Sequence, residues 1–330
     1  MTKGKKVAFA MIFTALLFAA LFCGFVMGSV KLSLSEIIGA VTDKKEYHTA
    51  RVILFDLRLP RVLGAALSGA ALSVSGFLLQ SVTANELCAP NVIGVNAGAG
   101  FAVILSMCLF PGMFAYQPVF AFIGALITTF TVIGLCSGRA NSKTLILLSG
   151  VAVSALFNAG ISFLSYRFPD VLPSYNAFAA GGFSGVKMSD IAIPAVIILV
   201  FCTAAQAVAP SLNLLCLGDG MARSLGVRVG ALRIISLVFS AALCAASVSF
   251  AGLVGFVGLI VPNAVRRFFR RDARFDIPMC IVCGAALTVT GDLIGRVLFS
   301  PSELPAGIVM AVIGAPFFLA LLFRQRRGEA

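Results

Sequence analysis

Residues 211–230 read SLNLLCLGDGMARSLGVRVG, a polar and glycine-rich segment between two long apolar stretches of the chain. Apolar residues recur in it at spacings of three and four, which predicts one apolar helical face, formed by Leu214, Leu217, Met221 and Leu225. Gly218 and Gly220 interrupt this pattern. Asp219 is a candidate cap for a second short helix, which Gly226 ends. We therefore expect two short helices that lie across a membrane surface, with an ordinary amphipathic interfacial loop as the alternative.

The rest of the sequence is too apolar for a soluble protein. Hydrophobic residues make up 60% of the 330 positions and charged residues only 12%, which leaves too little polar surface for a soluble domain. We expect an all-α integral membrane protein in which residues 1–330 form one transmembrane domain. At about 20 residues per span, the apolar stretches predict ten transmembrane helices, at about 7–29, 60–81, 91–110, 116–136, 144–166, 191–209, 231–250, 252–266, 278–299 and 306–323.

The basic residues predict the orientation in the membrane. If both termini are cytoplasmic, 16 of the 25 Lys and Arg residues fall in inside segments, as the positive-inside rule requires. Both termini inside also demands an even number of spans, which ten satisfies. The net charge of +12 follows from this bias and from attraction to anionic lipid, so it does not imply nucleic acid as a partner.

Several kinds of active or binding site are not indicated. The single His, His48, forms no cluster with metal-ligand spacing, and no P-loop pattern for ATP is present. No nucleophile with a base and an orienting acid can be assembled, so we expect no catalytic residues, no metal site and no cofactor. Asp292 is the one acidic residue well inside an apolar run, and Arg296 stands four residues later. We interpret these two residues as a structural ion pair, with a proton or sodium relay as the alternative.

A weak internal repeat relates the two halves of the chain. A shift of 172 residues superposes Arg61 on Arg233, Ser68 on Ser240 and Ser75 on Ser247, among eight identities in 31 positions. The span that contains Ser68 is expected to run inward and its counterpart outward, so the two copies would be inverted, as in many transporters. The first copy also presents two small faces suited to close helix contact, which are Gly64, Ser68, Ala71, Ser75 and Gly69, Ser73, Gly76, Gln80.

Five segments together resemble the FecCD family, the permease subunits of type II ABC importers for ferric siderophores, haem and vitamin B12. These are RLPRVLGAALSGAALSVSGFLLQ at 58–80, NELCAPNVIGVNAGAG at 85–100, LGDGMARSLGV at 217–227, GLVGFVGLIVPNAVRR at 252–267 and GDLIGRVLFSPSELPAGIVMAVIGAPFFLALL at 291–322. Two places depart from the family pattern: residues 85–90 read Asn-Glu-Leu-Cys-Ala-Pro where the family usually has Asn-Pro-Leu-Ala-Asp-Pro, and Asn263 stands where the family has a His.

The resemblance implies the fold and the partners of the protein. It implies a ten-helix permease paired with a second permease subunit, as a homodimer or heterodimer. It also implies two cytoplasmic ATPase subunits and an extracytoplasmic substrate-binding protein, in a bacterial or archaeal cytoplasmic membrane. Hydrolysis of ATP is then expected on the separate ATPase subunits. The segment at about 211–228 corresponds to the cytoplasmic coupling helices of such a permease.

The family also suggests candidate sites. A basic docking site for the binding protein is expected at Arg58, Arg61 and Arg296, with anchoring to lipid headgroups as the alternative. Contact with the ATPase is expected at Leu217, Gly218, Asp219, Ala222, Arg223 and Gly226. The short turn with Asn141 and Ser142 is expected at the cytoplasmic gate. A polar stripe is expected to line the translocation pathway, or to form interhelical hydrogen bonds instead, at Ser154, Asn158, Ser162 and Ser165.

The cargo is constrained by this stripe and by the family. Small hydroxyls and one amide suit a bulky, hydrated cargo, whereas a bare metal ion calls for His or carboxylate ligands. A ferric siderophore is the first candidate cargo because it is the commonest cargo of the family, and haem or cobalamin comes next. A self-sufficient channel or an ion-coupled secondary carrier is the alternative of another class. The lack of acidic residues near the membrane midplane and the structured inner segment favour the ABC importer.

Overall fold

The computed structural model describes residues 3–42, 45–136, 143–269 and 272–328. These residues are helical, without strands. The α-helices are α1 (Lys3–Val26), α2 (Leu34–Val41), α3 (His48–Arg51), α4 (Leu59–Thr83), α5 (Val95–Leu109), α6 (Gln117–Leu135), α7 (Lys143–Arg167), α8 (Leu172–Ala180), α9 (Met188–Leu215), α10 (Asp219–Ser224), α11 (Val229–Ala251), α12 (Val257–Phe269), α13 (Ala273–Leu298) and α14 (Ala306–Gly328). Short 3-10 turns η1 (Lys45–Tyr47), η3 (Phe114–Tyr116) and η4 (Pro169–Val171) and a π-helical segment η2 (Val52–Arg58) connect them.

The ten predicted spans correspond one by one to α1, α4, α5, α6, α7, α9, α11, α12, α13 and α14. Within the described residues, eight helices are long and apolar enough to cross a membrane, and α5 is a shorter apolar helix. The predicted spans 231–250 and 252–266 are divided at Gly252, where a positive φ of 66° ends α11. A side chain there would collide with the carbonyl oxygen of Phe178, because a Cβ would lie 2.4 Å from it.

One boundary differs from the sequence expectation. The second span was expected to begin at about residue 60, yet α3, η2 and α4 form one continuous helix from His48 to Thr83. Pro60 stands in the first turn of α4 and lacks a backbone N–H, which interrupts the regular ladder of the preceding residues. The π-helical turn η2 accommodates that interruption, with the backbone N–H of Leu59 donating to the carbonyl of Leu54. The helix therefore continues where the proline suggested a start.

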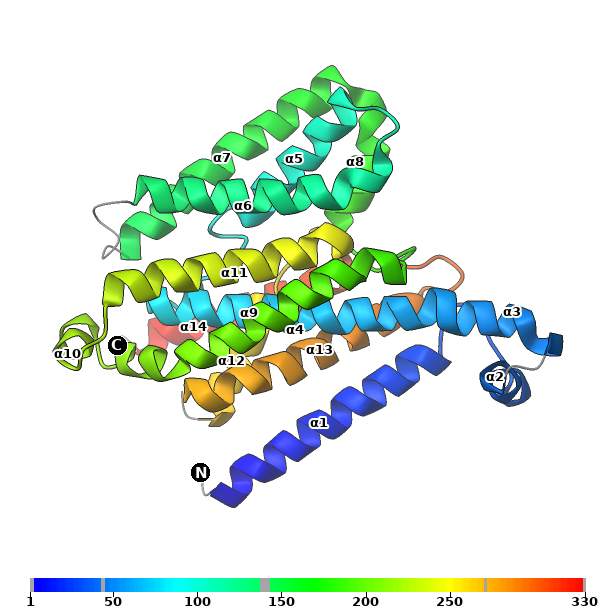
Figure 1. The fold of residues 1–330 in the computed structure, drawn as a ribbon, viewed down its shortest axis with the longest axis horizontal. Helices are drawn as coiled ribbons and strands as arrows, with labels where there is room; N and C mark the ends of the chain where they lie inside the picture. Colours follow the sequence, from blue (N-terminus) through cyan, green and yellow to red (C-terminus); the bar gives the residue numbers. More distant parts are fainter. Residues whose placement is uncertain (1–2, 43–44, 137–142, 270–271, 329–330) are drawn as a thin grey trace.

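The helices form a long bundle around α4 (Figure 1). The α4 helix packs against α11, α13 and α12, and α1 lies on the outside of α13. The helices α5, α6, α7 and α8 form a layer above α11, which contacts α6. The short helix α10 lies at one end of the bundle, called the coupling end here, and α2 and α3 lie at the other, called the arginine end. The first residues of α1 lie toward the coupling end as well.

The two small faces predicted on residues 64–80 are contact surfaces of α4. Ser68 and Ser75 face α11, where their hydroxyls lie 2.7 Å from those of Ser247 and Ser240. The other face meets α13 and α12 so closely that a Cβ at Gly69 would lie 2.2 Å from the carbonyl oxygen of Gly284. The structure therefore confirms that these small residues serve close helix packing.

Candidate functional site

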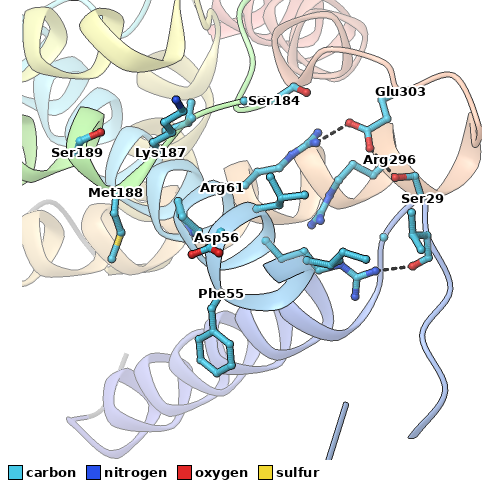
Figure 2. A pocket seen from close by; sticks show the side chains of 18 residues that line it. Ser29, Phe55, Asp56, Arg61, Ser184, Lys187, Met188, Ser189, Arg296 and Glu303 are labelled. Carbon is cyan, nitrogen blue, oxygen red and sulfur yellow. Dashed lines mark hydrogen bonds and ion pairs between the residues drawn. The ribbon is translucent and has the colours of Figure 1, made fainter. Parts of the chain in front are cut away.

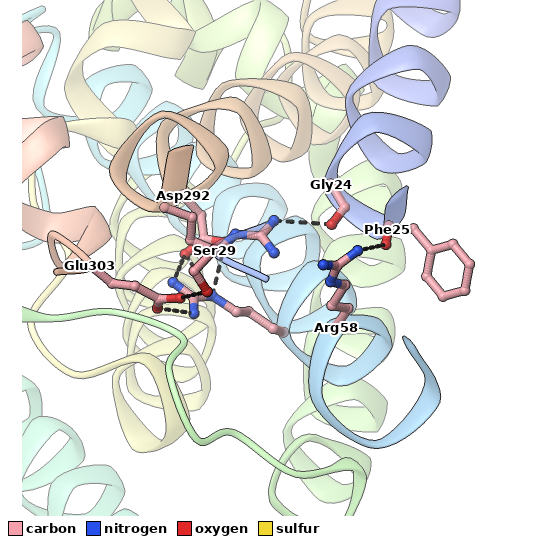
Figure 3. A network of polar contacts seen from close by, with 8 residues as sticks. Gly24, Phe25, Ser29, Arg58, Asp292 and Glu303 are labelled. Atoms are coloured by element: carbon pink, nitrogen blue, oxygen red, sulfur yellow. Dashed lines mark hydrogen bonds and ion pairs between the residues drawn. The ribbon is translucent and has the colours of Figure 1, made fainter. Parts of the chain in front are cut away.

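The arginine end holds a buried network of charges that begins at Arg61 (Figure 3). Arg61 stands in the first turn of α4, and its Nε lies 3.0 and 3.1 Å from the two carboxylate oxygens of Asp292 on α13. Its Nη2 donates to Oδ1 of Asp292 at 2.9 Å, and its Nη1 donates to Oε2 of Glu303, in the loop between α13 and α14. One guanidinium thus joins two acidic residues that the sequence separates by about a dozen positions.

The predicted ion pair of Asp292 and Arg296 is part of this network. Arg296 Nε lies 3.1 Å from Oδ2 of Asp292, one helical turn earlier on α13. Arg296 also donates from Nη2 to the carbonyl oxygen of Gly24 on α1 at 3.1 Å. An uncompensated buried charge is costly, and the carboxylate of Asp292 pairs with both buried arginines, Arg61 and Arg296. The structure confirms the ion pair that the spacing predicted.

Arg58 completes the basic cluster by capping α1. Its guanidinium donates to the carbonyl oxygens of Phe25, Val26 and Val30, around the C-terminal end of that helix. The carbonyls of Phe25 and Val26 have no partners within the helix and carry the negative end of its dipole, so a cation stabilises them. Ser29 in the same segment donates to Oε1 of Glu303 at 2.8 Å. The network therefore ties the end of α1 to the loop before α14.

The three arginines line one cavity of 710 Å³, together with Asp56, Lys187 and Glu303 (Figure 2). The sequence predicted that Arg58, Arg61 and Arg296 share a face, and the structure places them together. It also buries them: their exposed fractions are 5%, 8% and 2%. Lys187, at the start of α9, is exposed at the same cavity.

Ser29, Lys187 and Glu303 of this site were absent from the sequence prediction. No local spacing pairs Glu303 with Arg61, because 242 residues separate them. Burial raises the pKa of Glu303, but the hydrogen bonds from Arg61 and Ser29 outweigh burial and lower the pKa below its ordinary value. Glu303 is therefore an ionised partner of Arg61 near neutral pH.

The coupling end differs in two ways from the helices expected for residues 211–230. The first expected helix is the last part of the 28-residue α9, which runs to Leu215. The second is α10, whose cap is Gly218, so the prediction that Asp219 caps it is wrong. Asp219 is instead the first residue of α10, and its carboxylate turns toward Arg233 on α11. Gly226 ends the turn after α10 with a φ of 87°, as predicted.

The side chains of this segment divide into exposed and buried groups. Of the predicted apolar face, Leu217, Met221 and Leu225 are each more than half exposed and point away from the bundle, whereas Leu214, on α9, is half-buried. Gly218, Arg223 and Gly226 are exposed as well. Ala222, also assigned to the ATPase contact, is fully buried against the bundle and does not reach the surface. The exposed surface of this segment is thus largely apolar, with the cations Arg223 and Arg228 beside it.

The predicted polar stripe lies on α7. Asn158 and Ser162 are exposed, and Ser154 and Ser165 are half-buried. Ser162 donates to the carbonyl of Asn158 at 3.0 Å, and Ser154 donates to that of Gly150 at 2.7 Å. These two hydroxyls therefore bond within their own helix, as serine does in helices.

Two further predictions concern the cytoplasmic gate and metal ions. Asn141 and Ser142, assigned to the gate, lie outside the described residues. Among the residues that are described, no group of three or more His, Cys, Asp or Glu side chains is placed to hold a metal ion.

Known proteins share this fold and sequence along almost the whole chain. The model of the FecCD transport family matches residues 16–324. The iron(3+)-hydroxamate import system permease protein FhuB of Bacillus subtilis is 36% identical over 305 residues, which cover 92% of this chain and 79% of FhuB. The hemin transport system permease protein HmuU of Yersinia pestis is 34% identical over 306 residues, covering 91% of this chain and 90% of HmuU.

A solved structure agrees with these relatives. An inward-facing conformation of a metal-chelate type ABC transporter superposes with a TM-score of 0.83 and 28% sequence identity, covering 95% of this chain and 98% of the other. Family model, relatives and fold coincide over the same residues. The chain therefore belongs to the FecCD transport family and is a multi-pass membrane permease subunit, a transport component and not an enzyme.

Proposed function

We propose that this chain is the permease of an ABC importer that carries an iron chelate into the cytoplasm, with a ferric siderophore as the first candidate cargo. The observation that carries the proposal is the uncharged polar stripe on α7, in a chain whose relatives are permeases for iron hydroxamate and hemin. Hydroxyl and amide groups give many weak contacts to a hydrated chelate, which can then enter and leave. Haem is the second candidate, because HmuU is as similar as the hydroxamate permease.

The assembly follows from the two ends of the bundle. We propose a second permease subunit, two ATPases and a binding protein, with both termini and α10 at the cytoplasmic side. The exposed apolar surface of Leu217, Met221 and Leu225, on α10 and in the turns beside it, has the character of a surface that enters a groove of another protein. Residues 213–226 are then the contact of the ATPase, and Ala222 supports that contact from beneath.

The arginine end is proposed as the docking site of the binding protein. The cavity of 710 Å³ gives an incoming carboxylate access to Arg58, Arg61 and Arg296. Glu303 holds Arg61 in the undocked chain, so an acidic side chain of the binding protein would replace one carboxylate with another. Lys187 is exposed at this cavity and supplies attraction before contact.

Reconstitution in proteoliposomes tests the cargo. The permease is combined with the ATPase and the binding protein of its importer, and uptake of radiolabelled ferric hydroxamate, ferric citrate, haem and cobalamin is compared. We expect ATP-dependent uptake of a ferric hydroxamate or citrate. Uptake of haem or cobalamin alone would replace the proposed cargo, and uptake without ATP would overturn the importer itself.

Docking is tested at the exposed lysine, because reversal of a buried arginine would also disturb folding. Lys187→Glu is expected to weaken binding-protein affinity and to reduce its salt dependence. The matched control is Lys31→Glu, which changes an exposed lysine that does not line the cavity. If the wild type, Lys187→Glu and Lys31→Glu bind the binding protein with equal affinity, docking at this cavity is contradicted.

A further inference from the structure

Arg233 is one of the largest fully buried side chains among the described residues, with an exposed fraction of 0%. It stands in the second turn of α11, at the coupling end. A buried guanidinium is tolerated only when its charge is compensated and its donors are used. The partners of Arg233 therefore show which elements the fold requires to stay together.

Two of these partners lie on other helices. Nη2 of Arg233 lies 2.8 and 2.7 Å from the two carboxylate oxygens of Asp219, the first residue of α10. Nε donates to the carbonyl oxygen of Val82 at 3.2 Å, in the last turn of α4. One buried cation on α11 thus holds both α10 and the end of α4.

The α10 helix depends on such anchoring. It has only six residues, which is far too short for a helix to be stable on its own. Gly218 and Gly226 flank it with φ values of 100° and 87°, and a Cβ at either glycine would meet no atom within 4 Å. The bundle contacts α10 at Ala222, which is buried, and at Asp219, which pairs with Arg233. The glycines by themselves fix neither its position nor its direction.

We propose that Arg233 is a positioning residue for α10: through Asp219 it fixes the helix to α11 and α4, so that α10 moves with these two helices as one body. This inference rests on the proposed contact of residues 213–226 with an ATPase. It assigns to Asp219 an inward role, where the sequence suggested an outward one. The ATPase then acts on α11 and α4 through the ion pair, and the exposed residues of α10 supply the contact.

The anchoring is tested first in the isolated permease, in lipid nanodiscs, by hydrogen exchange. Asp219→Asn is the main variant because Asp219 is partly exposed and asparagine has the same shape; Arg233→Gln is the second. A charge-assisted bond contributes enough that the amides of Ala222 and Leu225 should exchange at least about tenfold faster in Asp219→Asn. Asp190→Asn, in the first turn of α9, is the matched control and should leave α10 unchanged. Wild-type exchange rates in α10 of Asp219→Asn would overturn the proposal.

Coupling is then measured in the complete importer. We expect Asp219→Asn to lower the number of chelate molecules taken up per ATP hydrolysed at least about threefold, with unchanged affinity for the binding protein. The exchanged pair Asp219→Arg with Arg233→Asp should recover part of the loss. The amides of α10 could exchange faster in Asp219→Asn while the number of chelate molecules taken up per ATP hydrolysed stays at the wild-type value. The ion pair would then only stabilise the fold, which overturns the inference. If instead the wild-type chain binds no ATPase, the proposed function fails while the hydrogen-exchange result still stands.

Discussion

The hydroxyl oxygens of Ser68 on α4 and Ser247 on α11 lie 2.7 Å apart, and Ser75 and Ser240 repeat this contact at the same distance. Within each helix the two serines are seven residues apart, and α11 carries them in the opposite order, so the helices are antiparallel. A shift of 172 residues takes Ser68 to Ser240 and Ser75 to Ser247. A two-fold axis between α4 and α11 would exchange the two contacts, which is what an inverted repeat requires.

The serine contacts give the first prediction. In a double-mutant cycle of Ser68→Ala and Ser247→Ala, we expect a coupling free energy of about 0.6 kcal/mol and at most about 1.7 kcal/mol, the mean and the maximum for hydrogen bonds between membrane helices. The cycle is measured by unfolding in detergent micelles. Ser106→Ala is the control, since Ser106 donates to the carbonyl of Val103 within α5. Coupling between Ser106 and Ser247 as large as that of the pair would contradict a direct bond.

Glycine contacts give the second prediction. A Cβ at Gly76 would lie 1.8 Å from the carbonyl oxygen of Gly258, so Gly76→Ala should lower the free energy of unfolding by about 2 to 3 kcal/mol. The control is Gly134→Ala on α6, where a Cβ would meet no atom within 4 Å. There we expect no loss, and a gain of up to about 1 kcal/mol from helix propensity. Equal effects of both substitutions in thermal unfolding would refute the close contact.

The pKa of Glu303 gives the third prediction. A carboxylate whose folded pKa is lowered stabilises the fold above its unfolded pKa of about 4.3, and this stability is lost as the pH falls through the folded pKa. We therefore expect Glu303→Gln to lower stability by about 1 kcal/mol and to do so equally across the range from pH 5 to 8. The difference between wild type and variant should disappear only in more acidic solution. A difference that already shrinks between pH 7 and 5 would mean that Glu303 is not held ionised by Arg61.

The glycine before α10 gives the fourth prediction. Gly218 has φ 100° and ψ 156°, a conformation that costs other residues about 1 to 3 kcal/mol. Gly218→Leu and Arg223→Glu should each reduce ATPase binding in a pull-down at fixed ATPase concentration, while binding-protein docking stays unchanged. Gly134→Ala serves again as control. If ATP hydrolysis stays normally coupled to uptake in both variants, this segment is only an interfacial loop and does not contact the ATPase.

The polar stripe gives the fifth prediction. A cysteine at Asn158, in a Cys216→Ser background, should react with a membrane-impermeant maleimide in the assembled importer and react more slowly when the chelate is present. A cysteine at Ile193, an exposed apolar position on α9, should stay unlabelled because lipid covers it. Labelling is read from peptide masses. Protection of position 158 equal to that of position 193 would exclude the stripe from the pathway.

Local patterns in the sequence predicted the helices and their packing faces, but they did not predict the long-range ion pairs. The spacing of Asp292 and Arg296 shows that they share a helix face, and the structure confirms their contact. The pairing of Arg61 with Asp292 spans 231 residues and depends on how α4 packs on α13. Only the packed bundle brings these two residues together, so no periodicity indicates the contact.

Asp219 shows a second limit of the sequence. A carboxylate in a polar segment was assigned to an external partner because the sequence does not indicate which side of a short helix is covered. Arg233 lies on the next helix, 14 residues later, and its guanidinium donates a hydrogen bond to that carboxylate. Both residues were visible in the sequence, but their burial was not. A residue that the sequence places at a contact with a partner protein can therefore also have a partner within the chain, which the sequence does not indicate.

Close backbone contacts restrict where this bundle can change shape during a transport cycle. Gly69 and Gly76 leave no room for α4 to slide or turn against α13 and α12. In the layer above, a Cβ at Gly124 on α6 would lie 2.4 Å from the carbonyl oxygen of Gly98 on α5, so that pair is equally locked. Shear within either layer would drive backbone into backbone. The two layers meet between α6 and α11, and the close contact of Phe178 on α8 with Gly252, after α11, fixes one end of that boundary. Alternating access would then resemble two rigid layers that tilt against each other about that end.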